Sequence, residues 1–384
     1  MPPEAVYIHI PFCASKCHYC DFTAYVVKGQ PVDEYLSALE KEMEMWVRIV
    51  PPGRIRTVYI GGGTPTVLNP SRMERLLSAI RRFFPDWAGD MEFTAEANPG
   101  TTGPELLRVM REGGVNRLSL GVQTFRPDLL KRIGRTHTVE DVFRSVEQAR
   151  AAGFGNLSFD LIFGLPDQRG KDMEQSLALA LKPDHLSVYS LKVEENTLFH
   201  TLHERGRLPL PSEDEELAMY QLTRRRLAEA GFVHYEISNF ARPGRESRHN
   251  SIYWLNEEYY GLGAGAHGYV GGWRHANVRG VREYIRLCRE DRLPAAERNR
   301  VPVTEAMENE MILGLRLLQG VDPSRFYRRY GKRVEEIFAP VLARMFDRGL
   351  LTEREGRLVL TERGILFGNE VFAAFLGEAE LAGG

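Results

Sequence analysis

The sequence is short of cysteine, of net charge and of long apolar runs. Only four cysteines occur in 384 residues, too few for a disulfide-stabilised secreted scaffold. A formal net charge of −2 favours neither nucleic acid nor another polyanionic partner. No apolar run approaches the ~20 residues of a membrane span, and residues 1–4 lack the basic cluster of a signal peptide. These absences favour a globular protein that resides in the cytoplasm.

Three of the four cysteines lie in one short stretch, YIHIPFCASKCHYCDF, at Cys13, Cys17 and Cys20. Pro11 and the small and polar residues around it predict a loop that follows a strand at 6–10. Clustered thiols in the cytoplasm favour zinc or an iron–sulfur cluster. Structural zinc takes four ligands. His18 is a poor fourth ligand, because a residue adjacent to a ligand, here Cys17, rarely reaches the same metal. A [4Fe–4S] cluster with one iron open to S-adenosylmethionine fits better, although a zinc knuckle stays an alternative.

Short β-rich runs alternate with amphipathic helical patterns through the first half of the chain, which predicts βαβ units and a parallel sheet. The expected strands are 6–10, 57–60, 91–95, 117–120, 157–163 and 186–190, and the clearest expected helices are 32–46, 71–84, 104–112 and 139–152. Six such units indicate an α/β fold, a partial (β/α)6 barrel. The stretches GGGTPT, EANP, GVQTF and DLIFGLP lie at strand ends, and these ends converge on one face of a barrel.

The pattern changes after residue 200, and we expect three parts: a barrel over 1–235, a connecting segment rich in glycine and aromatic residues over 236–300, and a mainly helical, winged-helix-like domain over 301–384. Ser212 and Glu215 form a capping box for a helix that ends near residue 230. The last part predicts helices at 305–318, 322–330 and 334–348, a β pair, and a helix from 363. Its 11 basic and 13 acidic side chains disfavour DNA binding.

Taken together, the CxxxCxxC loop after YIHIPF, the strand-end motifs and the final module resemble the radical S-adenosylmethionine proteins of the HemN/HemW group. That group contains oxygen-independent coproporphyrinogen III oxidases and haem chaperones. The resemblance implies that Cys13, Cys17 and Cys20 hold the [4Fe–4S] cluster. It also implies two sets of S-adenosylmethionine contacts: Tyr7, Gly62 and Glu96 for a molecule on the cluster, and Tyr19, Gly63, Thr64, Gln123, Arg135 and Asp160 for a second one.

The residue types suit these roles. Glycines 61–63 let a ligand approach the backbone, and Glu96 can accept hydrogen bonds from an ammonium or from ribose hydroxyls. Arg135 can clamp a carboxylate with two hydrogen bonds, and Asp160 can bind hydroxyls or an amine. Each residue also has an ordinary structural interpretation: a glycine turn, a surface arginine or an N-capping aspartate.

Two features favour the haem chaperone branch over the oxidases. Phe22 stands where the oxidases have a fourth cysteine, and Cys288 is expected to be a buried structural thiol. The stretch HNSIYW matches an HNxxYW motif proposed to take part in haem binding, with His249 as an axial ligand and Tyr253 and Trp254 stacked on the porphyrin. His267 is a weaker candidate ligand, and a buried, hydrogen-bonded His249 is the alternative.

The resemblance therefore implies a protein that binds haem as cargo and passes it to acceptors such as respiratory haem proteins. It also implies a homodimer and peripheral membrane contact. Coproporphyrinogen oxidation stays the alternative activity, and whether the protein is an enzyme stays open. A winged-helix nucleic-acid binder is the third class, which the charge of the last domain disfavours. The stretch GLGAGAHGY resembles a dinucleotide fingerprint, but it follows NEEYY rather than a clear strand.

Overall fold

The computed structural model describes residues 2–180 and 182–381. A nine-stranded sheet forms its centre, in the order β11-β1-β4-β5-β6-β7-β8-β10-β9. Neighbours from β11 to β8 are parallel, whereas β10 and β9 pair antiparallel at the edge. The parallel strands are β1 (Ala5–Ile10), β4 (Ile55–Gly62), β5 (Trp87–Ala97), β6 (Arg117–Gln123), β7 (Asn156–Phe163), β8 (His185–Ser190) and β11 (Tyr260–Leu262). The edge strands are β9 (Val233–Glu236) and β10 (Asn239–Ala241).

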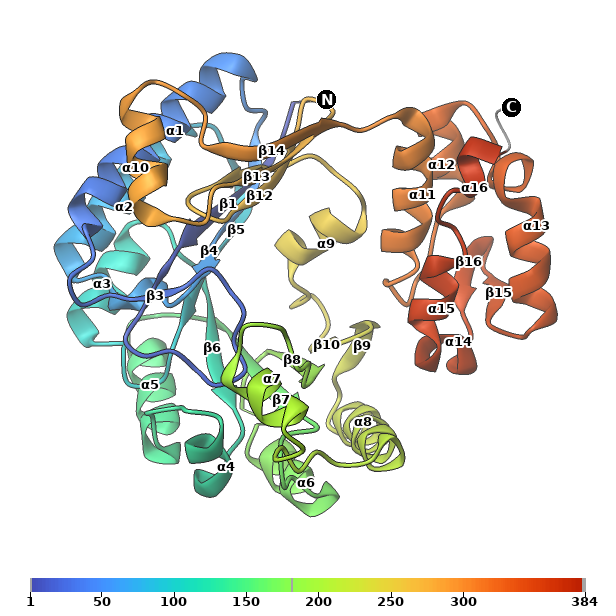
Figure 1. Cartoon of the computed structure of the whole chain (residues 1–384), viewed down its shortest axis with the longest axis horizontal. Coiled ribbons are helices and arrows are strands. Elements are labelled where there is room, and N and C mark those ends of the chain that lie inside the picture. Colours follow the sequence, from blue (N-terminus) through green and yellow to red (C-terminus); the bar gives the residue numbers. More distant parts are fainter. Residues whose placement is uncertain (1, 181, 382–384) are drawn as a thin grey trace.

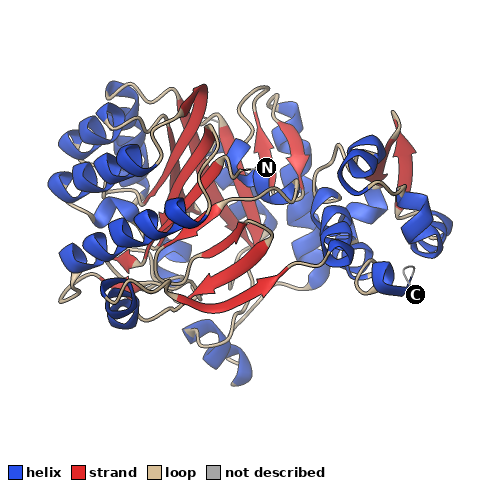
Figure 2. Cartoon of the chain, turned by 90° about the horizontal axis from the view of Figure 1, so that it is seen from above, coloured by secondary structure: helices blue, strands red, loops and turns tan. Residues whose placement is uncertain are grey.

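Helices cover the outer, convex face of this curved sheet (Figures 1 and 2). They are α1 (Val32–Ile49), α2 (Pro70–Phe83), α3 (Pro104–Glu112), α5 (Val139–Ala151), α6 (Gly170–Leu179) and α8 (Glu213–Glu229). Two short helices, α4 (Pro127–Arg132) and α7 (Leu198–Glu204), pack together in a separate small apolar cluster that includes Tyr19 of the cysteine loop. In α1 the apolar residues Tyr35, Leu39 and Met43 recur at helical spacing and are buried against the sheet. The expected α/β partial barrel is therefore confirmed, together with each of its six predicted strands.

The strands alternate between an apolar outer face and a polar inner face. In β4, Val58 and Ile60 belong to the core shared with the outer helices, while Thr57 and Tyr59 point to the concave side, where they contact His249. Successive side chains of a strand point to opposite faces. The concave face is consequently lined by polar side chains and does not form an ordinary apolar barrel core.

The segment 236–300 is more ordered than its composition indicated. It contains two helices, α9 (Arg248–Trp254) and α10 (Val281–Arg289), and the strand β11, which the sequence did not predict. It also contains a small sheet in the order β12-β13-β14, formed by β12 (His267–Val270), β13 (Trp273–Asn277) and β14 (Ala295–Arg300). β11 extends the main sheet beside β1. At Gly261 a Cβ would lie 1.7 Å from the His267 carbonyl oxygen, so only glycine fits there. A strand, β12, follows the glycines of GLGAGAHGY instead of the helix of a dinucleotide site.

The C-terminal part has its own apolar core, around Met311, Phe326 and Phe338. Its elements are α11 (Val303–Gly314), α12 (Pro323–Tyr330), α13 (Val334–Asp347), β15 (Leu351–Arg354), β16 (Arg357–Leu360), α14 (Glu362–Leu366), α15 (Gly368–Ala373) and α16 (Glu378–Leu381). Figure 1 shows this domain beside the open side of the barrel, with α9 between the two. None of the helices in the described ranges is both long and apolar enough to span a bilayer.

Two helix predictions in this domain differ from the structure. The helix expected over 305–318 ends at Gly314, because Leu317 leaves the helix to form a β-bridge with Glu236. The single helix expected from 363 is divided into short helices, and the backbone at Phe367 and Gly377 is not helical. The helix over 334–348 is present with a kink at Phe338, two residues before Pro340.

Candidate metal and cofactor site

The cysteine loop is closed at its base by two short parallel strands. β2 (Phe12–Cys13) pairs with β3 (Tyr25–Val26), and Val27 N donates to Cys13 O at 2.9 Å. The loop is also tied to the end of β4, where Thr64 N donates to Phe12 O at 2.7 Å. These bonds hold the three cysteines at the carboxyl ends of the parallel strands, where sites in such sheets form.

The three thiols of this loop are free and half-buried. Thr64 Oγ1 donates to Cys13 Sγ at 3.5 Å. Burial raises the pKa of Cys13 and raises that of Cys20 to about 11, so a bound cation would have to stabilise the thiolates. In the described part of the chain, no three His, Cys, Asp or Glu side chains lie close enough together to bind one metal ion. An iron–sulfur cluster does not need such an arrangement, because each thiolate binds a different iron.

The ring of His18 is held by residues outside the cysteine loop. Its ring Nδ1 is hydrogen-bonded to Arg132 O at 2.9 Å, and its ring lies 6.2 Å from that of Phe199. Its backbone N donates to Ile133 O, and its carbonyl accepts from Phe199 N, both at 3.1 Å. His18 thus anchors the loop to α4 and α7. Cys288 is buried on α10, as expected for a structural thiol.

Glu96, near the end of β5, is a half-buried acid of the site. Its Oε1 accepts from Tyr59 OH at 2.7 Å and its Oε2 from Gly62 N at 3.1 Å. Burial raises the pKa of Glu96 to about 7, and nearby Asp160 raises it further. Gly62 has φ +109°, and a Cβ there would lie 2.6 Å from the His9 ring. A Cβ at Gly63 would lie 2.5 Å from the Phe12 carbonyl oxygen, so both glycines are required by the local geometry.

Two further residues from the predicted sets border this acid. Tyr7 of β1 stacks on Tyr59 with ring centroids 6.1 Å apart, and its hydroxyl is hydrogen-bonded to His9 Nδ1 at 2.9 Å. Asp160 of β7 accepts from Ser119 Oγ at 3.2 Å, and burial raises its pKa. The concave face at this level therefore carries two carboxyl groups, which suit ligands with amino or hydroxyl groups.

A second group of polar side chains surrounds Arg135. Its Nη1 donates to Asn98 Oδ1 at 2.7 Å and its Nη2 to Tyr19 OH at 3.0 Å. Its buried Nε has no hydrogen-bond partner, and such an orphaned donor is costly unless a ligand satisfies it. Gln123 lies beside it in a left-handed backbone conformation, φ 68°, and its Nε2 lies 3.0 Å from the position of a Cβ at Gly121. An anionic ligand would satisfy Arg135.

Two residues that join these groups were not identified as site residues from the sequence. Asn98 Nδ2 donates to Thr64 Oγ1 at 2.9 Å while its Oδ1 accepts from Arg135, so Asn98 links the cysteine loop to the Arg135 group. Tyr59 connects Glu96 to α9. Asn98 stands in the EANP motif, which offered a signal; Tyr59 directly precedes IGGGTPT, but its contacts are tertiary and no spacing reveals them.

The HNxxYW motif forms α9, and its histidine is fully buried. Nδ1 of His249 is hydrogen-bonded to Thr57 Oγ1 at 2.9 Å, and Nε2 to Tyr253 OH at 2.7 Å. Burial, followed by nearby Arg117, lowers the pKa of His249 to about 3. The indole of Trp254 lies under the Arg316 guanidinium, 4.4 Å from it. A haem iron could reach His249 only after one of its two ring hydrogen bonds had broken. His267, by contrast, is exposed at the start of β12.

Comparison with known proteins gives consistent results over the whole chain. Residues 7–180 match the model of the Radical SAM superfamily, and residues 301–367 match that of the HemN C-terminal domain. The chain is 48% identical to "Heme chaperone HemW" of Bacillus subtilis, over 98% of this chain and all of that protein. It is 36% identical to the protein of the same name from Escherichia coli, over 98% and 99% of the two chains.

Among solved structures, the fold matches that of the coproporphyrinogen III oxidase HemN from Escherichia coli, described as a radical SAM enzyme. The TM-score is 0.85 at 25% sequence identity, and the match covers 97% of this chain and 90% of the other. The barrel and the C-terminal domain are therefore arranged as in that protein.

Proposed function

Because the chain belongs to the radical SAM superfamily, and within it to the family of the heme chaperones HemW, we propose that it binds haem and transfers it to acceptor haemoproteins. The observation that carries this proposal is the full-length identity of 48% to a heme chaperone, against 25% to the structurally matched oxidase. Phe22, 65% exposed, supports it, since it replaces the fourth cysteine of the oxidase pattern. Respiratory haem proteins are the acceptors that the resemblance implies.

We further propose that Cys13, Cys17 and Cys20 each bind one iron of a [4Fe–4S] cluster. The loop fits this group because it is closed at its base, anchored to the barrel and lined by three free thiols, and burial raises the pKa of two of them, Cys13 and Cys20. When bound, such a cluster supplies an open iron for S-adenosylmethionine and an electron for its sulfonium. The residues of the chain do the rest: they bind the cofactor, orient it and exclude water.

Glu96, Tyr7 and Gly62 would hold the S-adenosylmethionine on the cluster. The carboxyl group of Glu96 can accept from the cofactor's amino or hydroxyl groups, and a Cβ at Gly62 would fill the space beside His9. Tyr19, Gly63, Thr64, Gln123, Arg135 and Asp160 would hold a second molecule, in the way the resemblance implies. The partnerless Nε of Arg135 supports an anion on this side.

The test is a hemin titration of anaerobically reconstituted protein, followed by mixing of the haem-loaded protein with an apo-haemoprotein. We expect a saturable Soret band and its replacement by the spectrum of the acceptor. Absence of saturable binding, or haem that never leaves, would overturn the proposal. The same preparation, given coproporphyrinogen III, S-adenosylmethionine and reductant, should form no protoporphyrinogen; product would make the oxidase the better assignment.

Several expectations stay predictions. They are haem ligation by His249 with stacking by Tyr253 and Trp254, a homodimer, peripheral membrane contact, cytoplasmic residence and the absence of nucleic-acid binding. The first of them requires one of the two ring hydrogen bonds of His249 to break, because both ring nitrogens are engaged within the protein. The Soret position of His249→Ala, compared with that of the wild type, tests it directly.

A further inference from the structure

Helix α9 is packed into the open, concave side of the barrel (Figure 1). At its start, the carboxylate of Glu92 on β5 accepts from Arg248 N and His249 N, each at 3.0 Å. The His249 ring then stacks on Tyr59 of β4, with centroids 5.2 Å apart and planes 30° apart. With the bond to Thr57, these contacts join the first two residues of α9 to two neighbouring strands.

Tyr59 carries this contact to the proposed cofactor site. Its hydroxyl donates to Glu96 Oε1 at 2.7 Å, while its ring stacks on both His249 and Tyr7. Glu96 uses its second oxygen to accept from Gly62 N. The orientation of Tyr59 therefore determines where one oxygen of Glu96 lies, and His249 restrains that orientation through a ring stack.

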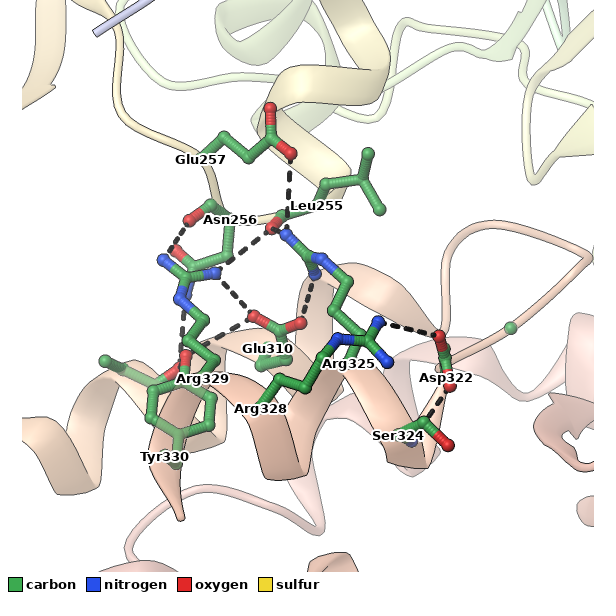
Figure 3. Close-up of polar contacts among 12 residues, drawn as sticks. Leu255, Asn256, Glu257, Glu310, Asp322, Ser324, Arg325, Arg328, Arg329 and Tyr330 are labelled. Atoms are coloured by element: carbon green, nitrogen blue, oxygen red, sulfur yellow. Dashed lines mark hydrogen bonds and ion pairs between the residues drawn. The ribbon is translucent and has the colours of Figure 1, made fainter. Parts of the chain in front are cut away.

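The other end of α9 is held by the C-terminal domain (Figure 3). Arg325 Nη2 donates to Leu255 O and Arg329 Nη2 to Asn256 O, both at 2.7 Å. These are carbonyls at the carboxyl end of the helix, where cations are stabilising. Glu310 of α11, with only 3% of its side chain exposed, pairs with both arginines. The two guanidinium groups are thus fixed by a buried carboxylate and cannot turn freely away from α9.

We propose that His249 is a positioning residue for the S-adenosylmethionine site, acting through Tyr59 on Glu96, and that Arg325 and Arg329 of the C-terminal domain hold it in place through α9. The inference rests on the cofactor site proposed above. It gives the HNxxYW motif a role that the haem-ligand interpretation lacks: the motif connects the C-terminal domain with the interior of the barrel.

The test uses reconstituted, reduced protein, with the affinity for S-adenosylmethionine measured by anaerobic equilibrium dialysis. The change in the paramagnetic resonance spectrum of the cluster on cofactor addition is the second readout. His249→Ala removes the stack and both ring bonds. His249→Phe keeps a ring on Tyr59 and loses only the bonds. His234→Ala is the matched control, because His234 stacks on Phe240 at 4.3 Å, in the edge strands β9 and β10 away from Glu96.

We expect His249→Ala to bind S-adenosylmethionine at least tenfold more weakly, with unchanged iron content and an altered cofactor-induced spectrum. His249→Phe should recover part of the loss, and His234→Ala should match the wild type. Arg329→Met should weaken binding less, and its effect should not add to that of His249→Ala, since both act through α9. If His249→Ala does not fold, Arg329→Met still tests the inference.

Equal cofactor affinity and equal spectra for wild type, His249→Ala and Arg329→Met would overturn the inference. Loss of the haem Soret band in His249→Ala with cofactor affinity intact would also overturn it, and would return His249 to the role of haem ligand. Failure of the wild type itself to bind S-adenosylmethionine would reject the proposed cofactor site, and this inference with it.

Discussion

A buried carboxyl group makes the stability of the barrel depend on pH near neutrality. Glu42 of α1 is fully buried, and its carboxyl oxygens accept from Gly263 N at 2.7 Å, Tyr284 OH at 2.5 Å and Asn277 Nδ2 at 2.7 Å. Burial raises the pKa of Glu42 from 4.5 to about 7. The folded chain then binds this proton more tightly than the unfolded chain does. The stability from this group is therefore complete below pH 4.5 and is lost as the pH rises through 7.

Glu42→Gln removes this titration. A rise from 4.5 to about 7 corresponds to about 3 kcal/mol of unfolding free energy, of which about 2.5 kcal/mol falls between pH 5 and pH 8. The NH2 group of the glutamine would face the donors that now bind the Glu42 oxygens, and such donors need an acceptor. This mismatch lowers the unfolding free energy by an amount that does not depend on pH. Burial raises the pKa of the neighbouring Tyr284 and Cys288, so neither group titrates in this range.

The assay is urea unfolding of the cluster-free chain, followed by circular dichroism at pH 5 and at pH 8. The difference in unfolding free energy, wild type minus variant, should fall by about 2.5 kcal/mol from the lower to the higher pH. Because only this difference is compared, groups that titrate equally in both proteins cancel. A difference that stays constant within about 0.5 kcal/mol, at equal denaturant slopes, would refute the argument.

Gly62 has a positive φ, and Gly62→Ala places a methyl group 2.6 Å from the His9 ring. This variant should abolish the change that S-adenosylmethionine causes in the paramagnetic resonance spectrum of the cluster. The control Gly89→Ala, with nothing within 4 Å of its Cβ, should retain that change. Cys17→Ala should lower the iron content of reconstituted protein to background, whereas Cys288→Ala should retain it; equal iron in both would contradict the proposed ligand set. Ser212→Ala removes one half of the capping box of α8 and should lower the unfolding free energy by about 1 kcal/mol, measured by urea unfolding.

The barrel could be predicted from the sequence because its strands and helices are locally consistent. The helix over 104–112 and the capping box at Ser212 occur as expected, since both depend on neighbouring residues alone. β11 could not be predicted, because three residues carry no periodicity and its stability comes from pairing with β1. The end of α11 at Gly314 likewise depends on a tertiary contact, the bridge between Leu317 and Glu236.

The candidate site divides in the same way. Residues in recognisable motifs, such as Glu96 in EANP and Gln123 in GVQTF, could be named from the sequence. Tyr59 could not, because it matters through side chains that come from distant parts of the chain. For His249, the pattern could not distinguish a haem ligand from a buried, hydrogen-bonded histidine; in this structure its two ring nitrogens are both bonded within the protein.

Helix α9 supplies hydrogen-bond partners to part of the polar inner face of the sheet. Parallel strands covered on both faces are usually apolar throughout, but here Thr94, Arg117 and Ser158 are buried with at most 2% of their surface exposed. Burying such groups is costly unless they are hydrogen-bonded, so each needs a partner from the sheet itself or from a segment packed on its inner face. His249 bonds to Thr57 from α9, and Ser158 bonds to His185. Moving α9 away from the sheet would therefore leave Thr57 and Glu92 without these partners, and the bonds from Arg325 and Arg329 to the carbonyls of residues 255 and 256 oppose that movement.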